Sequence, residues 1–467
     1  MYAIPHLGEN SRFDAVKPMF LKPNFRHTHN LLGLVVAVLA GCGGSSIYDE
    51  LKNATPTPVS DSCELATQKT ALLEYMQTAY LWSDLAPQPG PENYGSLESY
   101  FAALLFTGSA TQPADRWSYL SDSGQYNQFF EDGQTLGYGI FVNGLEGQLP
   151  LRIRYIEPRS PAALQELKRG DVIEAINGIS AATLFATGNF AALSPQKDGD
   201  TVVLQIANDA GLRTVIVAGA TYDLQPVAAH AVFTATDGRK VGYVSLKDFI
   251  TQAEQPIEAA IGAIRAEGAS DIIVDLRYNG GGRISTSNKL ASLIAGNAHD
   301  GKVFVRLTHN AKVRFLDSEY TLAANAPGFT RAIVLTGART CSASELLVNG
   351  LKPFMEVVTV GGQTCGKPFG FQPVDSCGKT ISAVNFESFN ALGEGRYYQG
   401  LVPGCAVTEN FTGHLGDPKE TLTAAALERL QTGRCAAATP APRLLLQASP
   451  VRRLNPEPGE FRGMRAD

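Results

Sequence analysis

The sequence predicts an α+β chain of several domains: a small helical domain, a short β-rich unit and a mixed α/β core. Three observations predict this fold class. Apolar residues recur at helical spacing near the start of the mature region. Short alternating strand patterns separated by glycine turns come next, and strand patterns then alternate with helix patterns. The 467 residues are enough for two or three such domains.

The composition narrows the function classes. Hydrophobic residues make up 44% of the chain and charged residues 18%, as in an ordinary globular protein. The formal net charge of −6 provides no global basic surface of the kind that nucleic-acid binders carry. We therefore expect no nucleic-acid partner, and no motif points to a cofactor.

The N-terminal segment predicts export. Residues 31–40 are apolar and follow the basic Lys22 and Arg26, and residues 39–42 read Leu-Ala-Gly-Cys. This pattern resembles the lipobox of bacterial lipoproteins, in which cleavage leaves the cysteine as the lipidated first residue. The alternative is an ordinary signal peptide with an incidental cysteine.

We accordingly expect residues 1–41 to be a lipoprotein signal peptide, with Met19 as the true start. Residues 42–62 would be the tether. The resemblance implies a bacterial cell-envelope lipoprotein attached to the membrane through Cys42. Gly43 after it favours the outer membrane, facing the periplasm.

Residues 63–134 form the expected helical domain. Apolar positions beginning with Leu65 and Leu72 recur at helical spacing through residues 63–82. A second helix is expected at residues 97–105.

Residues 135–222 form the expected β-rich unit. Its strands are predicted at residues 151–156, 171–176, 201–207 and 213–217. Between the first two, Ser160 and Pro161 mark a helix start and Gly170 a helix end.

Residues 223–435 form the expected α/β core, and residues 436–467 an extended or disordered tail rich in proline and arginine. The core strands are predicted at residues 241–246, 272–276, 302–307, 332–336 and 357–360. The core helices are predicted at residues 256–267, 285–295, 344–351 and 420–430.

A serine and a lysine carry the strongest chemical signal. Ser342 opens a predicted helix as Ser-Ala-Ser-Glu, and Lys367 follows 25 residues later in Cys-Gly-Lys-Pro (367 − 342 = 25). A neutral lysine amine can take the proton of a serine hydroxyl. The alternative for the serine is structural, since Ser342 and Glu345 also fit a helix capping box.

A glycine loop upstream points to the same chemistry. The apolar run at residues 272–274 leads into Asp-Leu-Arg-Tyr-Asn-Gly-Gly-Gly, which ends at Gly282. Free N–H groups in such a loop can hold an oxyanion. Taken alone, however, a glycine triplet after a strand is more often a turn.

Together, these motifs resemble the C-terminal processing (tail-specific) peptidases of the S41 type, over roughly residues 63–435. The resemblance implies that Ser342 is the nucleophile and Lys367 the general base. It also assigns the oxyanion donors to Gly280, Gly281 and the backbone N–H of Ala343. It further implies a crotonase-like or ClpP-like core and no metal or other cofactor.

One position departs from the family pattern. Many members place a glutamine four residues after the lysine, but Phe371 stands there and Gln372 follows one residue later. A shift of one residue along a strand turns a side chain to the opposite face. Gln372 and Glu345 are the candidates for groups that orient Lys367, whose free-state pKa of about 10.4 burial must lower for it to act as a base.

The order of the β-rich unit resembles a PDZ domain, which adds an extended peptide to a sheet edge. The resemblance implies that Gly137, Tyr138, Gly139 and Ile140 hold a terminal carboxylate. The substrates would then be protein or peptide C-terminal tails, with an adaptor protein as a further partner. A glycine-rich turn in another small β-domain is the alternative.

Six cysteines remain besides Cys42, which suggests disulfides in an oxidising compartment. Proximity favours Cys365 with Cys377 and Cys405 with Cys435, although sequence alone cannot select a connectivity. Cys341 is a rival nucleophile beside Ser342. A zinc site is disfavoured, because no C-x-x-C pair exists.

The leading hypothesis is a lipid-anchored serine endopeptidase acting on C-terminal tails. One rival is a catalytically weak or inactive scaffold with a peptidase fold. Another is a Ser-Lys hydrolase of non-protein amides or esters, against which the PDZ-like unit argues. A Ser-His-Asp triad is the competing mechanism among hydrolases. The sequence shows no recognisable motif around its candidate histidines, which are His230, His299, His309 and His414.

Overall fold

The computed structural model describes residues 62–146, 149–435 and 463–466. Several predictions lie outside these residues. They are the signal segment at residues 1–41 with Met19, the lipidation residue Cys42, the tether up to residue 61 and tail residues 436–462.

The described helices follow the predicted order, with several short additions. They are α2 (Leu65–Thr78), α3 (Leu97–Leu104), α4 (Ser123–Phe130), α5 (Pro161–Leu164), α6 (Ala181–Thr187), α7 (Glu254–Ala266), α8 (Ile284–Ala295), α9 (Ala343–Leu351) and α10 (Thr421–Thr432).

A six-stranded sheet forms the centre of the core. Its order is β10 (Val227–Thr234), β11 (Lys240–Leu246), β12 (Asp271–Asp275), β16 (Arg331–Thr336), β17 (Glu356–Gly361) and β22 (Cys405–Ala406), parallel except for β10.

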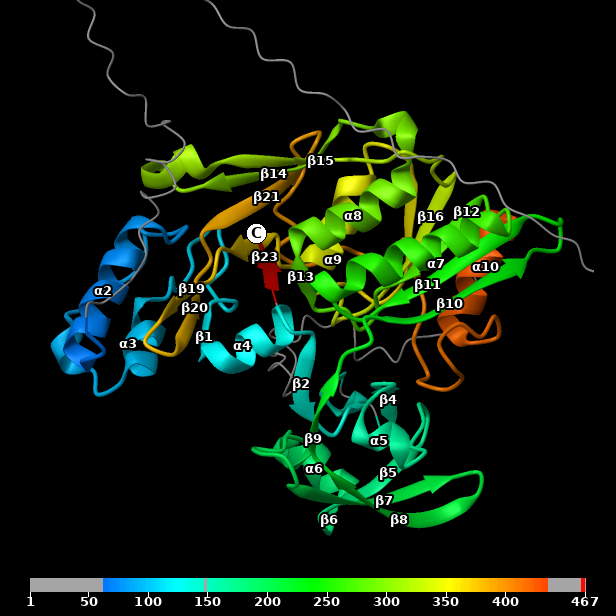
Figure 1. The fold of residues 1–467 in the computed structure, drawn as a ribbon, viewed down its shortest axis with the longest axis horizontal. Helices are drawn as coiled ribbons and strands as arrows, with labels where there is room; N and C mark the ends of the chain where they lie inside the picture. Colours follow the sequence, from blue (N-terminus) through cyan, green and yellow to red (C-terminus); the bar gives the residue numbers. More distant parts are fainter. Residues whose placement is uncertain (1–61, 147–148, 436–462, 467) are drawn as a thin grey trace, which may run out of the picture. The chain divides into compact units, whose positions relative to one another are not determined.

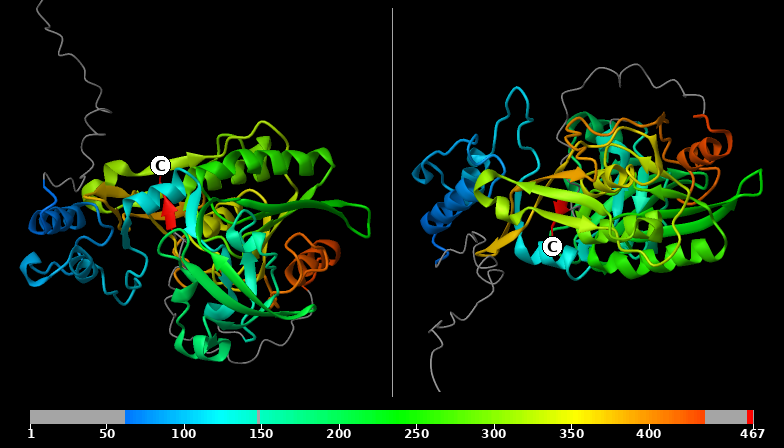
Figure 2. Two further views of the ribbon diagram at one scale, coloured as in Figure 1. Left: turned by 60° about the horizontal axis from the view of Figure 1, so that its bottom comes forward. Right: turned by 90° about the horizontal axis from the view of Figure 1, so that it is seen from above.

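Helices cover both faces of this sheet. Figures 1 and 2 show the helices around the sheet. Ile272 and Val274 of β12 pack with α7, α8 and α9, whereas Ile273 between them packs with α10. Because successive side chains of a strand point to opposite faces, this alternation buries β12 on both sides. The carboxyl ends of β12 and β16 lead into the two glycine- and serine-bearing loops of the site.

A second six-stranded sheet lies beside the site and includes a piece of the tail. Its order is β13 (Gly281–Arg283), β23 (Gly463–Arg465), β18 (Phe369–Phe371), β21 (Phe386–Asn390), β14 (Val303–His309) and β15 (Ser318–Thr321). Figure 1 shows β23 in red next to β13. Sequence analysis did not foresee this strand.

The N-terminal helices pack against the lysine-bearing side of the core. Leu72 of α2 and Phe101 of α3 share a hydrophobic cluster with Phe369 of β18. A disulfide joins Cys63 to Cys377, so the predicted pairing of Cys365 with Cys377 is wrong. A three-stranded sheet of β1 (Tyr119–Asp122), β20 (Lys379–Ser382) and β19 (Val374–Ser376) extends this contact.

The β-rich unit consists of three small sheets. The four-stranded sheet has the order β6 (Ile179–Ser180), β5 (Val172–Ile176), β7 (Thr201–Asn208) and β8 (Gly211–Ala218). The two other sheets have two strands each. They pair β3 (Ile140–Val142) with β4 (Ile153–Ile156) and β2 (Gln134–Gly137) with β9 (Ala220–Asp223). The helix predicted between Ser160 and Gly170 is shorter than expected and stops at Leu164. Glu166 has a φ of 54°, which no continuing α-helix tolerates.

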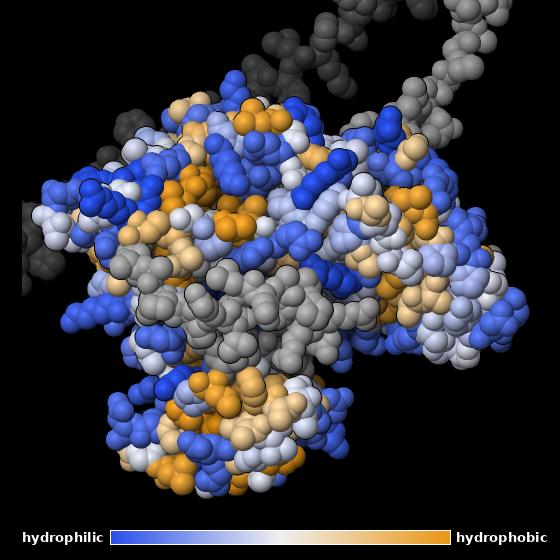
Figure 3. All heavy atoms as spheres, turned by 180° about the vertical axis from the view of Figure 1, so that it is seen from behind, coloured by the Kyte–Doolittle hydropathy of each residue, from blue (hydrophilic) through white to orange (hydrophobic). Residues whose placement is uncertain are grey.

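Within the described part of the chain, no helix is both long and apolar enough to cross a membrane. The face seen in Figure 3 mixes hydrophilic and hydrophobic side chains. Singly exposed apolar residues such as Leu212 and Ile216 are ordinary on such a surface.

Candidate active site

Ser342 lies at a sharp turn between β16 and α9. Its φ of 62° and ψ of −114° are unfavourable for a residue with a Cβ atom. The side chain is fully buried, and its Oγ has no hydrogen-bond partner among the described residues. Strained backbone of this kind is concentrated at functional sites, where the surrounding structure holds it.

Lys367 lies just before β18 and is 1% exposed. Its Nζ lies 4.5 Å from the centre of the Phe371 ring, the residue that stands where the family pattern has glutamine. Gln372 has other contacts than Phe371. Its backbone N–H donates to Asn385 Oδ1, while its buried side-chain Oε1 has no partner among the described residues. The structure therefore shows an aromatic contact to Lys367 from Phe371.

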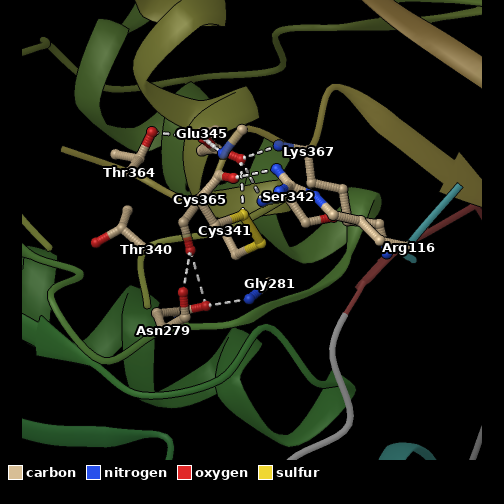
Figure 4. The surroundings of a disulfide bond; sticks show 12 residues. Arg116, Asn279, Gly281, Thr340, Cys341, Ser342, Glu345, Thr364, Cys365 and Lys367 are labelled. Carbon is tan, nitrogen blue, oxygen red and sulfur yellow. Dashed lines mark hydrogen bonds between the residues drawn. A yellow bond between two sulfur atoms is a disulfide. The ribbon is translucent and has the colours of Figure 1, made fainter. Parts of the chain in front are cut away.

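Glu345 connects the serine segment to the lysine segment (Figure 4). Its Oε2 accepts from the N–H of Ser342 at 2.9 Å and from that of Lys367 at 2.8 Å. Its Oε1 accepts from the N–H of Gly366 at 2.8 Å and from the hydroxyl of Thr364. Glu345 thus does more than cap α9, because one buried carboxylate holds both segments.

The charge state of Glu345 reflects two opposing effects. Burial raises the pKa of its carboxyl, while the four hydrogen bonds favour the ionised form; the net shift is upward. Arg116, whose Nη2 donates to Cys365 O at 3.2 Å, places a positive charge on the same side.

A disulfide between Cys341 and Cys365 also joins the two segments. The interpretation of Cys341 as a nucleophile is wrong in this structure, since its sulfur is bonded to another sulfur. For the same reason, Cys341, Cys365 and Glu345 do not offer a thiolate site to a metal. The predicted disulfide Cys405–Cys435 is confirmed.

The glycine loop lies directly against the serine. A Cβ atom on Gly281 would lie 2.9 Å from Ser342 Cβ and 3.1 Å from Ala343 N, so only glycine fits there. The N–H of Gly281 donates to Asn279 Oδ1 at 2.8 Å. Gly280 directly precedes Gly281 in the chain, and Ala343 begins α9.

Asn279 was missed by sequence analysis although it lies inside the motif. Its Oδ1 also accepts from Ser344 Oγ at 2.9 Å, and its Nδ2 donates to Leu246 O at 3.2 Å. Its side chain therefore fixes the glycine loop to the first turn of α9. The available signal in the sequence was a polar residue between an apolar strand pattern and a run of glycines.

A network of buried ion pairs surrounds Arg277, which precedes the glycine loop. Sequence analysis also missed this network. Arg277 contacts Asp275, Glu409 and Glu420 within hydrogen-bond distance, and Arg169 of the β-rich unit also contacts Glu409. Burial acts to raise the pKa of Glu409, but the two guanidinium groups outweigh it and hold that pKa below its usual range. This network ties the β-rich unit to the loop.

The four residues of the predicted carboxylate loop connect β2 to β3. Gly137 ends β2, Ile140 begins β3, and Gly139 has a φ of 77°. The side chain of Tyr138 is buried in the core of the β-rich unit, and its carbonyl accepts from Ala162 N at 3.0 Å. Gly137 and Ile140 belong to two separate small sheets, and neither sheet includes β16, the strand that leads to Ser342.

Two protein-family models match this chain, one over the core that carries the candidate site and one over the N-terminal helices. Residues 240–396 match the model of peptidase family S41, and residues 67–119 match the model of the peptidase S41 N-terminal domain. A carboxyl-terminal-processing protease of Picosynechococcus sp. is 27% identical over 267 residues, covering 55% of this chain and 61% of the relative. The chloroplastic carboxyl-terminal-processing peptidase 2 of Arabidopsis thaliana is 25% identical over 265 residues, covering 55% and 49%.

The chain spans about half to three fifths of the length of these curated relatives. A solved structure of a putative S41 protease from Bacteroides fragilis is similar, with a TM-score of 0.61 and 22% identity. The match covers 77% of this chain and 96% of that one, and it shows a shared fold.

Proposed function

We propose that this chain is a serine endopeptidase of peptidase family S41, the family of the C-terminal processing proteases, as the matches to its family models support. Ser342 is the nucleophile and Lys367 the general base, and the substrates are polypeptides cut near their C-terminal tails. The observation that carries this proposal is the strained, buried Ser342 joined to the Lys367 segment through Glu345.

The reaction proceeds through an acyl-enzyme. The neutral amine of Lys367 takes the proton of Ser342 Oγ as that oxygen attacks the peptide carbonyl. The oxyanion forms beside the N–H groups of Gly280 and Ala343, at the positive end of α9. Collapse breaks the C–N bond, and Lys367 gives its proton to the leaving amine. Water then hydrolyses the ester and restores Ser342.

Substrate capture is assigned to the β-rich unit, which we take as a PDZ-like domain with Gly137 to Ile140 as its carboxylate loop. The Arg169 contact with Glu409 supports a link from this unit to the glycine loop. The core is taken as crotonase-like or ClpP-like. An adaptor protein is retained as a further partner.

We propose that the protein works at the bacterial outer membrane, facing the periplasm, anchored by lipid on Cys42. The three disulfides support an oxidising compartment. Lipid labelling with a radioactive fatty acid tests this. Label should appear on the full chain and disappear in Cys42→Ala; label that persists in the variant would refute the anchor.

A second candidate is a scaffold that binds polypeptides without cutting them. Two observations favour it: Ser342 Oγ has no hydrogen-bond partner among the described residues, and the N–H of Gly281 is already paired with Asn279. An oxyanion hole of Gly280 and Ala343 alone would then have to suffice.

Cleavage of an unfolded protein with an apolar C-terminal tail separates the two. The full chain should cut it, and Ser342→Ala and Lys367→Ala should each lose at least about 1,000-fold in kcat, since nucleophile and base act as one unit. Lys352→Ala, at the end of α9, is the control for removing a lysine. Equal cleavage by Ser342→Ala would reject the dyad, and absence of cleavage by the unmodified chain would favour the scaffold.

A further inference from the structure

A three-residue piece of the chain's own tail completes the second sheet. Gly463, Met464 and Arg465 of β23 pair in parallel with β13 on one side. On the other side, Met464 and Arg465 pair in parallel with β18. Among the described residues, β13 and β18 are joined in this sheet only through β23. Without β23, a slot one strand wide would separate them.

The edges of this slot are the two segments of the candidate active site. Gly463 lies opposite Gly281, the residue whose backbone abuts Ser342. The far edge, β18, begins two residues after Lys367. An extended polypeptide in the slot therefore runs between the glycine loop and the lysine segment, with about 4.8 Å to each neighbouring strand.

Gly370 of β18 lies against the backbone of the tail strand. A Cβ atom there would lie 2.2 Å from the Phe386 ring and 2.7 Å from the carbonyl oxygen of Met464, so a larger residue would collide with both. The far side of β13 is already occupied, since Phe249 pairs with Gly282 there. The strand edge of β13 that faces the slot is thus the edge available for a peptide.

Each side chain of the tail strand has its own surroundings. Met464 is fully buried and Ala466 is 6% exposed, both within the main hydrophobic cluster. Arg465 Nη1 lies 2.7 Å from Glu131 Oε1, and its guanidinium lies over the rings of Tyr126 and Phe130. The slot accordingly accepts an apolar residue, then a basic one, then a small one.

We propose that residues 463–466 occupy the substrate position of this enzyme as an internal competing strand, and that Glu131 with Tyr126 and Phe130 selects a basic side chain there. This rests on the proposed peptidase function. The ligand class is an extended polypeptide with the pattern apolar, basic, small. Substrates with this pattern displace the tail and enter by strand addition.

Removal of the tail strand is the first test. A full-length chain and a variant ending at residue 462 are compared on a peptide substrate. Because a tethered segment has an effective concentration of about a millimolar, the shortened variant should gain roughly tenfold in kcat/KM, mainly through KM. Arg465→Glu in the full-length chain should give a similar gain without deletion, and Arg465→Lys should stay near the parent.

A matched control changes an arginine elsewhere. Arg434→Gln, at an exposed arginine outside the slot, should leave kcat/KM unchanged. A double-mutant cycle of Arg465→Gln and Glu131→Gln tests the contact itself. If the two side chains act through each other, the double variant should match the single variants rather than sum them.

Binding is measured separately from turnover. A labelled peptide with the sequence of residues 461–467 is titrated by fluorescence anisotropy into Ser342→Ala shortened to residue 462. Binding there, and weaker binding when arginine is replaced by glutamate in the peptide, would support the proposal even if no cleavage is ever seen. In that case the peptidase function alone would fail.

The opposite pattern overturns the inference. In that pattern the enzyme is active and its kcat/KM is the same with and without residues 463–467. Arg465→Glu also leaves kcat/KM unchanged, and the shortened form does not bind the peptide. If the shortened variant unfolds, Arg465→Glu decides in the same way.

Discussion

The segments of Ser342 and Lys367 and the tail strand meet at the same slot but are held in different ways. A disulfide and the buried carboxylate of Glu345 join the segments of Ser342 and Lys367. Backbone pairing, the buried side chains of Met464 and Ala466 and an ion pair with Glu131, a carboxylate 45% exposed, hold the tail strand. A covalent bond therefore joins the edges of the slot, whereas noncovalent contacts hold the strand between them.

The largest effect on this comparison should come from Glu345→Gln. The amide nitrogen of glutamine would face N–H donors that now point at a carboxylate oxygen, at about 1–3 kcal/mol for each buried mismatch. We expect kcat to fall about 100-fold, because the segments that carry Ser342 and Lys367 would shift relative to each other.

Steady-state kinetics on a peptide substrate, with circular dichroism to confirm folding, measure this effect. Glu428→Gln, on the exposed side of α10, is the control. A folded Glu345→Gln with the kcat of the parent would show that the carboxylate merely caps its helix.

The next effect should come from removing the disulfide with Cys341→Ala and Cys365→Ala together. Closing a loop with a sequence separation of 24 residues contributes about 3 kcal/mol of stability. We expect that loss, together with roughly tenfold lower kcat, since misplaced reacting groups slow catalysis steeply.

A second disulfide provides the control. Cys405–Cys435 closes a separation of 30 residues, so Cys405→Ala with Cys435→Ala should lose similar stability. Its kcat should stay at the parent value, because it joins β22 to the chain after α10. Equal kcat losses in both pairs would mean that the Cys341–Cys365 bond acts through global stability.

The sequence predicted the features that depend on neighbouring residues, namely the strands and helices of the core and the motifs of the candidate site. The strands and helices of the core followed from periodicity. Motif spacing singled out Ser342 and Lys367, which lie on segments that Glu345 joins. The pairing of Cys341 with Cys365 could not follow, since connectivity depends on which loops fold together. β23 could not follow either, because three residues carry no periodicity and their partners lie far away in the sequence.

The same limit applies to Gln372. Sequence position suggested that it orients Lys367, yet the ring of Phe371 lies under the amine. We expect Gln372→Ala to change kcat by less than about twofold. Phe371→Leu should lower kcat several-fold, because the ring packs against the buried lysine side chain and holds its amine in place. Parallel kinetics of the two variants decide, and the reverse order would restore Gln372 as the orienting residue.

The smallest effect should come from salt. The ion pair of Arg465 with Glu131 is partly exposed, so raising the ionic strength from about 0.05 to 0.5 M shortens the screening length and weakens it. An uncharged substrate should then compete better with the tail, and kcat/KM of the full-length chain should rise about twofold. The contacts of Glu345 are buried and should not respond. The variant ending at residue 462 lacks the ion pair, so its kcat/KM should be flat over the same range; a matching rise there would assign the salt effect to the dyad or substrate and separate it from the tail.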